Sequence, residues 1–235
     1  WLANIVVAPT NGPIMMAYSK TTTTPFYRTW NGTAWSAEGS AQAVVGNINY
    51  VVLKSSRTRN EAIMGVQTST GAIYVQTWNG TAWGNLTQVG TGPTTTRSFD
   101  IAYEKNGDRA VVAYSSGADF AYRIWNGTTL SGATTVTAPP TTGVVNWMEL
   151  RQNPLAASNE IAMIMLDANA DVYGMAWTAA PGALWERQPY GTLQLPAPLK
   201  KQSMSNTSKQ LEGRCLCGAI RLQPTSTTVF GTARR

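Results

Sequence analysis

The sequence predicts an all-β protein, a β-propeller built from four blades of about 48 residues, each with four strands. Three observations predict this fold. One motif recurs four times at nearly constant spacing, each copy divides into four short alternating runs, and turn residues separate the runs. A solenoid would use shorter repeats, and a string of sandwiches would need longer ones.

The repeated motif centres on a tryptophan. Residues 27–35 read YRTWNGTAW, residues 74–83 read YVQTWNGTAW, residues 122–129 read YRIWNGTT, and residues 173–177 read YGMAW as a degenerate fourth copy. The anchor tryptophans follow one another at intervals of 48, 47 and 52 residues, and they are Trp30, Trp78, Trp125 and Trp177. We therefore expect blades at about 1–46, 47–96, 97–142 and 143–190.

The third copy shows the strands most clearly. Runs 98–104, 109–115 and 120–125 alternate in polarity, and Asn126-Gly127 turns the chain into a short fourth strand. An Asn-Gly pair between such runs predicts a two-residue type I′ turn. With this turn at Asn31-Gly32, Trp30 and Trp35 lie diagonally on one face and Arg28 lies across from Trp35.

Four blades are the low end of the range in which propellers close. The repeats can close as a four-bladed ring, recruit the tail as part of a fifth blade, or pair with a second copy as a homo-oligomer. An open stack would leave a large apolar face in water, so we expect one of these closures.

Composition excludes several functions. The net charge is +6, but residues 1–190 hold 11 basic and 11 acidic residues, so the excess lies entirely in the tail and nucleic acid is not an expected partner. No apolar stretch reaches the 18 or so residues of a membrane span, so no membrane is expected either. Histidine is absent, which removes the commonest general base and metal ligand.

The repeats resemble those of long bacterial and archaeal secreted or surface proteins. The resemblance covers about residues 1–190 and is carried by the W-N-G-T-x-W core, as in YRTWNGTAWSAE. It implies a propeller-like fold and an extracellular or cell-surface origin for the parent of this region. It implies no chemistry.

The tail has a different texture. Residues 191–203 read as a linker, and residues 204–235 contain the segment MSNTSKQLEGRCLCGAIRLQ. This segment resembles the start of a glutathione-dependent formaldehyde-activating protein, with its C-x-C-G at Cys215-Leu-Cys217-Gly218, but the later cysteines of that family's zinc sites are missing. The join indicates a chimeric, metagenomic-type clone, and we predict no metal site from it.

Exposed aromatic side chains are the candidate ligand-binding residues. Trp35 and Trp83 lie near the edge of their blades, and Tyr50 and Trp147 lie on the first strands. The alternative role of the tryptophans is packing between blades, since neighbouring blades cover both faces of a propeller sheet.

A charged cluster is the candidate catalytic site. Aligning the first strands makes Tyr50, Asp100 and Trp147 equivalent, and then Lys54, Glu104 and Arg151; Glu149 lies between them. If the protein is an enzyme, Asp100, Glu104 and Glu149 with Lys54 and Arg151 supply carboxylates for hydrolysis or for Ca²⁺ or another divalent metal. The alternative is ordinary ion pairing of Glu104 with Lys54 and of Glu149 with Arg151.

The sequence thus favours a binding module for glycan or another polymer, with a glycan or a small molecule as the expected partner and no required cofactor. The rival hypothesis is a hydrolase of esters, phosphoesters or glycosides that uses the acidic cluster. Whether the protein is an enzyme stays open at this point.

Overall fold

The computed structural model describes residues 3–7, 14–107, 109–136, 143–155, 158–178 and 184–187, with only the backbone of the first and last ranges. In these ranges the chain forms β-strands and no α-helix, so the described part contains no helix able to cross a membrane. The predicted linker, the tail and both cysteines lie outside the described residues.

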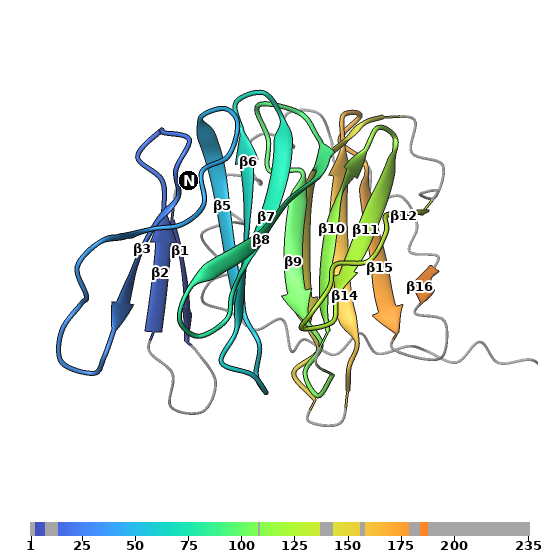
Figure 1. Ribbon diagram of the computed structural model, residues 1–235. Coiled ribbons are helices and arrows are strands. Elements are labelled where there is room, and N and C mark those ends of the chain that lie inside the picture. Colours follow the sequence, from blue (N-terminus) through green and yellow to red (C-terminus); the bar gives the residue numbers. More distant parts are fainter. Residues whose placement is uncertain are drawn as a thin grey trace, which may run out of the picture. The chain divides into compact units, whose positions relative to one another are not determined.

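The strands form four antiparallel sheets, each of four strands in chain order (Figure 1). Blade 1 contains β1 (Ala3–Val7), β2 (Ile14–Tyr18), β3 (Phe26–Trp30) and β4 (Gly39–Ser40). Blade 2 contains β5 (Ile48–Ser55), β6 (Ala62–Thr68), β7 (Ala72–Trp78) and β8 (Trp83–Thr91). Blade 3 contains β9 (Phe99–Tyr103), β10 (Ala110–Ser116), β11 (Asp119–Trp125) and β12 (Thr134–Val136). Blade 4 contains β13 (Val145–Gln152), β14 (Ile161–Asp167), β15 (Val172–Thr178) and β16 (Leu184–Arg187).

Three apolar cores join consecutive blades, and each core forms one seam. The first holds Tyr27 with Trp78, the second Val75 with Trp125, and the third Tyr122 with Trp177. Because side chains alternate across a strand, every blade has an incoming face with its anchor tryptophan and an outgoing face that meets the next blade. The propeller packing predicted for the tryptophans is therefore present in all three seams.

Burial separates the middle blades from the end blades. Strand β6 of blade 2 is buried at every position, and strand β10 of blade 3 at all but the last. Strand β14 of blade 4 instead alternates, with Ile161, Met163 and Met165 buried and the positions between them more exposed. Strand β2 of blade 1 alternates in the same way. Within the described residues, the middle blades are thus covered on both faces and the end blades on one.

The predicted two-residue turn is wrong. Asn31 N–H donates to the carbonyl of Ala34, and Trp30 pairs directly with Trp35, so four residues form the loop. The Oδ1 of Asn31 accepts the backbone N–H groups of Thr33 and Ala34, both at 2.9 Å. This side-chain bonding stabilises the loop with positive φ only at Gly32, whereas type I′ needs it at both central residues. Arg28 consequently reaches the carbonyl of Ser36.

The predicted alignment of the first strands is shifted by two residues between copies. In each first hairpin one N–H donates to the carbonyl that closes the loop: Ser56 to Glu61, Glu104 to Arg109, and Asn153 to Glu160. Ser56 is therefore equivalent to Glu104, and Lys54 is not. A shift of two keeps every side chain on its predicted face, which is why the alternation alone does not reveal it.

Candidate functional site

The seam between blades 2 and 3 holds a charged pair at the loop between β5 and β6. The Nη2 of Arg59 lies 2.9 Å from Oε1 of Glu61, and its Nε lies 3.3 Å from Oε2. Ser56 shapes this loop, because its Oγ accepts the backbone N–H groups of Thr58 and Arg59. The Arg59 side chain is 27% exposed and that of Glu61 is 9% exposed, so solvent reaches the guanidinium.

Blade 3 contributes a tyrosine to the same pair. The hydroxyl of Tyr103, at the end of β9, donates to Oε1 of Glu61 at 2.7 Å. Burial, the charge of Glu61 and this hydrogen bond raise the pKa of Tyr103 well above its usual value. Glu61 therefore accepts bonds from two blades, and it joins the β5–β6 loop to the inner strand of blade 3.

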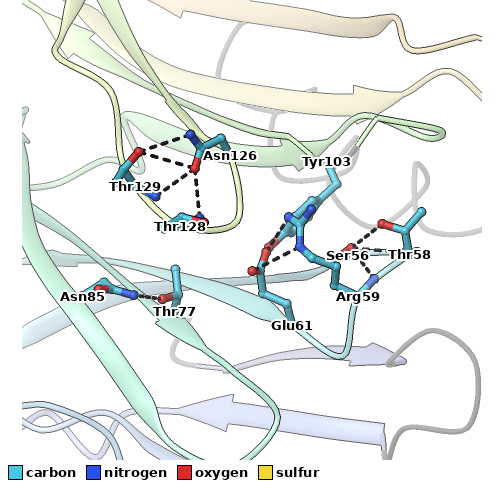
Figure 2. Close-up of polar contacts among 10 residues, drawn as sticks. All are labelled: Ser56, Thr58, Arg59, Glu61, Thr77, Asn85, Tyr103, Asn126, Thr128 and Thr129. Carbon is cyan, nitrogen blue, oxygen red and sulfur yellow. Dashed lines mark hydrogen bonds and ion pairs between the residues drawn. The ribbon is translucent and has the colours of Figure 1, made fainter.

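A turn of blade 3 lies against the guanidinium. Figure 2 shows the turn Asn126–Thr129 closed by Asn126, whose Oδ1 accepts the N–H groups of Thr128 and Thr129, near Arg59, Glu61 and Tyr103. Gly127 has a φ of +95°, and a Cβ there would lie 2.9 Å from Cζ of Arg59. Glycine is thus required at this position for two reasons: the positive φ and the close approach of the Arg59 guanidinium.

The anchor tryptophan of this seam has an unused donor. Trp125 is 4% exposed, and its Nε1 is buried without a hydrogen-bond partner among the described residues. An unsatisfied buried donor costs about 1–3 kcal/mol. The Nε1 of Trp83 in the first seam is also buried without a partner among the described residues, so two seams share this feature.

In the seam between blades 3 and 4, the indole N–H of the anchor tryptophan has a hydrogen-bond acceptor. The Nε1 of the equivalent Trp177 donates to Oε1 of Glu104 at 2.9 Å. Arg109 binds both oxygens of that carboxylate, at 2.7 and 2.9 Å, and this bonding raises the pKa of Arg109 above its usual value. Glu104 and Trp177 are 1% and 0% exposed. In this seam one buried carboxylate thus serves both the indole donor of Trp177 and the guanidinium of Arg109.

The predicted acidic residues lie in three separate environments. Asp100 is buried and receives the N–H of Leu150 at 2.7 Å, with Arg97 at 3.2 Å and Lys54 at 4.0 Å. Glu149 pairs with Arg151, as the alternative interpretation expected.

Glu104 pairs with Arg109 and not with Lys54, so the expected Glu104–Lys54 pair is wrong. The reason is the two-residue shift, which makes Lys54 equivalent to Ala102 in the repeat. The described residues contain no group of three His, Cys, Asp or Glu side chains that could hold a metal ion.

The predicted ligand-binding aromatics divide between seams and surface. Trp83 packs in the first seam, with its ring 5.9 Å from Tyr27, whereas Trp35 is 41% exposed on the incoming face of blade 1. The hydroxyl of Tyr50 donates to the carbonyl of Thr95. The ring of Trp147 lies 5.6 Å from the guanidinium of Arg97. A role for these four residues in ligand binding stays a prediction.

Sequence reasoning missed Arg59, Glu61, Tyr103 and Arg109. Their signal was present, because only 13% of residues are charged and charges flank the first hairpin of copies 2 and 3. The pairing partners, however, come from loops and from neighbouring blades, and no local pattern places them together.

Comparisons with known proteins identify the fold. No family model and no curated protein sequence matches the chain. A fungal lectin from Aleuria aurantia, a six-bladed β-propeller with fucose recognition, is similar in structure with a TM-score of 0.55 at 13% identity, over 82% of this chain and 65% of that chain. A mutant of AofleA from Arthrobotrys oligospora gives a TM-score of 0.53 at 14% identity, over 82% of this chain and 56% of that chain. The NanB sialidase from Streptococcus pneumoniae gives 0.51 at 7% identity, over 83% and 52%.

The chain thus spans less than two thirds of the length of each of these structures. Identities this low establish the architecture alone. The chain has the β-propeller fold that its repeats predict, with four-stranded antiparallel blades.

Proposed function

We propose that the protein is a glycan-binding module and that its site lies at the seam of blades 2 and 3, around Arg59 and Glu61. The observation that supports this most is the partly exposed ion pair of these two residues, whose carboxylate also receives the hydroxyl of Tyr103 from the next blade. Known ligand sites combine apolar walls with a few convergent polar groups, and this seam offers both.

The chemistry of the pair suits a sugar. Each hydroxyl of a sugar both donates and accepts hydrogen bonds, so a neighbouring pair of hydroxyls can donate to Glu61 and accept from Arg59. Hydrogen bonds to charged groups are roughly twice as strong as those between neutral groups. The backbone of the Asn126–Thr129 turn borders the guanidinium and limits the directions from which a ligand can approach.

The comparisons suggest which glycans to test first. A variant of the Aleuria aurantia lectin forms complexes with Fucα1-6GlcNAc and with α-methyl-L-fucoside. Those ligands belong to those proteins, and fucosides enter here as the first probes. The hydrolase hypothesis stays a prediction.

The test is a glycan array followed by calorimetric titration of each glycan that binds. We expect Arg59→Gln and Glu61→Gln each to weaken binding at least tenfold, because each removes charged hydrogen-bonding capacity from the site. Arg123→Gln is the matched control, since Arg123 bonds to the Ser131 carbonyl on the edge of blade 3.

Two outcomes would refute the proposal. A folded protein that binds nothing on the array would remove the function. Binding that survives both seam substitutions but is lost in Trp35→Ala or Trp83→Ala would move the site to the aromatic residues predicted from the sequence.

A further inference from the structure

The end blades leave two complementary faces partly uncovered. On the incoming face of blade 1, Trp35 is 41% exposed and Trp30 is half-buried. On the outgoing face of blade 4, Ile164 is 44% exposed and Ala162 is also exposed. Trp35 and Ile164 are two of the large hydrophobic side chains that are exposed to solvent in the described part of the chain.

The internal seams show what an incoming face binds. At the first seam the ring of Tyr27 packs on Trp78, with centroids 5.3 Å apart, and at the third Tyr122 packs on Trp177, also at 5.3 Å. Trp30 is the equivalent anchor of blade 1. Its ring centroid lies 5.6 Å from that of Trp35, and the ring centroids of Trp78 and Trp83 are 5.7 Å apart. The incoming face of blade 1 is thus built like that of an internal seam, and none of the three hydrophobic cores covers it with another blade of the described residues.

The outgoing face of blade 4 fits this role. In the hairpin register Gly174 occupies the position of Tyr27 and Tyr122, and it pairs with Ile164. A glycine here leaves room above the sheet for the Trp30 and Trp35 rings, and Ile164 supplies an apolar surface beside it. The three hydrophobic cores join blades 1 to 2, 2 to 3 and 3 to 4, and none of these cores joins blade 4 to blade 1 among the described residues.

We propose that a second copy of this chain docks the outgoing face of its blade 4 on the incoming face of blade 1. The contact continues the blade-to-blade packing of the internal seams. Two chains that dock reciprocally make an eight-bladed ring, which is within the four to eight blades typical of propellers. If the rotation between blades is instead that of a six-bladed ring, two four-bladed chains cannot close a ring, and the same contact repeats head to tail as an open series.

The first measurement is the solution mass of the whole chain by sedimentation across a range of concentrations. We expect twice the 25.3 kDa of one chain, or a concentration-dependent series of its multiples. Trp35→Glu and Ile164→Glu should each give a monomer. Val45→Glu is the control, since Val45 is 73% exposed and lies outside both faces, and it should leave the mass unchanged.

Mixing the two monomeric variants gives the decisive result. The Ile164→Glu chain keeps an intact blade 1 face and the Trp35→Glu chain keeps an intact blade 4 face, so the mixture should recover one contact and a heterodimer. A symmetric contact of Trp35 with Trp35 would leave Ile164→Glu dimeric, and would overturn the proposal. A monomeric natural sequence would also overturn it and would point to another segment of the same chain as the cover. Circular dichroism confirms that each variant is folded.

Discussion

The seams on the two sides of blade 3 use one repeat position for opposite purposes. At the seam with blade 4, the Glu104 carboxylate accepts hydrogen bonds from the indole N–H of Trp177 and from Nε and Nη2 of Arg109. This carboxylate is buried. At the seam with blade 2, Ser56 replaces the carboxylate, and the acid has moved to the other end of the hairpin as Glu61. Trp125 then has no hydrogen-bond partner among the described side chains, and the carboxylate is 9% exposed at Glu61 against 1% at Glu104.

This difference teaches how a repeat protein can separate stability from binding. The framework of the seams is constant, since each places an anchor tryptophan against the preceding blade. The polar residues at the first hairpin of each seam differ, so under the proposed function one seam stabilises the fold while its neighbour binds the ligand.

Glu104→Ala should give the largest loss of stability. It leaves Arg109 and the buried Trp177 N–H without their acceptor, and removing one partner of a buried ion pair typically costs about 3–5 kcal/mol. Because Arg109 is 36% exposed, we expect the low end of that range. Urea denaturation measures the change.

The control for Glu104 is Glu160→Ala, an exposed carboxylate on the equivalent hairpin of blade 4. Its carboxylate accepts only exposed hydrogen bonds, from Asn153 and Ser158, so the free energy of unfolding should fall by about 1 kcal/mol or less. Equal losses in the two variants would mean that the sealed seam has no special role. Glycan binding should be unchanged in both, provided that the protein remains folded.

Tyr103→Phe should have the next largest effect. It removes a 2.7 Å hydrogen bond to the Glu61 carboxylate, which is worth about 1.5–3 kcal/mol for a charged acceptor. The raised pKa of Tyr103 also makes a pH signature. Its stabilising contribution is complete below the unfolded pKa of about 10 and is lost as pH rises through the folded pKa, because the unfolded chain releases the proton first.

The measurement is the free energy of unfolding from pH 7 to about 11 for the natural sequence and for Tyr103→Phe. The difference between the two proteins should shrink as pH rises above about 10. A constant difference across this range would show that Tyr103 titrates alike in the folded and unfolded chains.

Gly127→Ala should have the smallest effect on stability and a large one on binding. Alanine at positive φ costs about 1 kcal/mol, and its Cβ would lie 2.9 Å from Cζ of Arg59, so the guanidinium must move. Gly32→Ala is the matched control, since Gly32 has a φ of +103° in the same turn of blade 1 with no atom near its Cβ. Thermal melting and glycan titration should show similar destabilisation in both variants but weaker binding only in Gly127→Ala.

The sequence predicted the fold well because the signals of the fold are local. The spacing of Trp30, Trp78, Trp125 and Trp177 gave the repeat, and alternation gave the faces on which these rings pack. The predicted two-residue turn was wrong because Oδ1 of Asn31 accepts backbone N–H groups of its own loop. The preference of Asn-Gly for type I′ turns does not include this interaction. The site was missed because Glu61 meets Tyr103 across 42 positions and a seam.

The uneven covering of the blades also determines how the molecule opens. Each blade contacts only its neighbours within the described part of the chain, so its unfolding free energy is approximately the sum of an intrinsic term and of its seams. Blades 2 and 3 each take part in two of these seams, and blades 1 and 4 each take part in one. Amide hydrogen exchange should therefore be slowest in β6 and β10 and faster in β2 and β14, with fluctuations that fray the molecule from its ends.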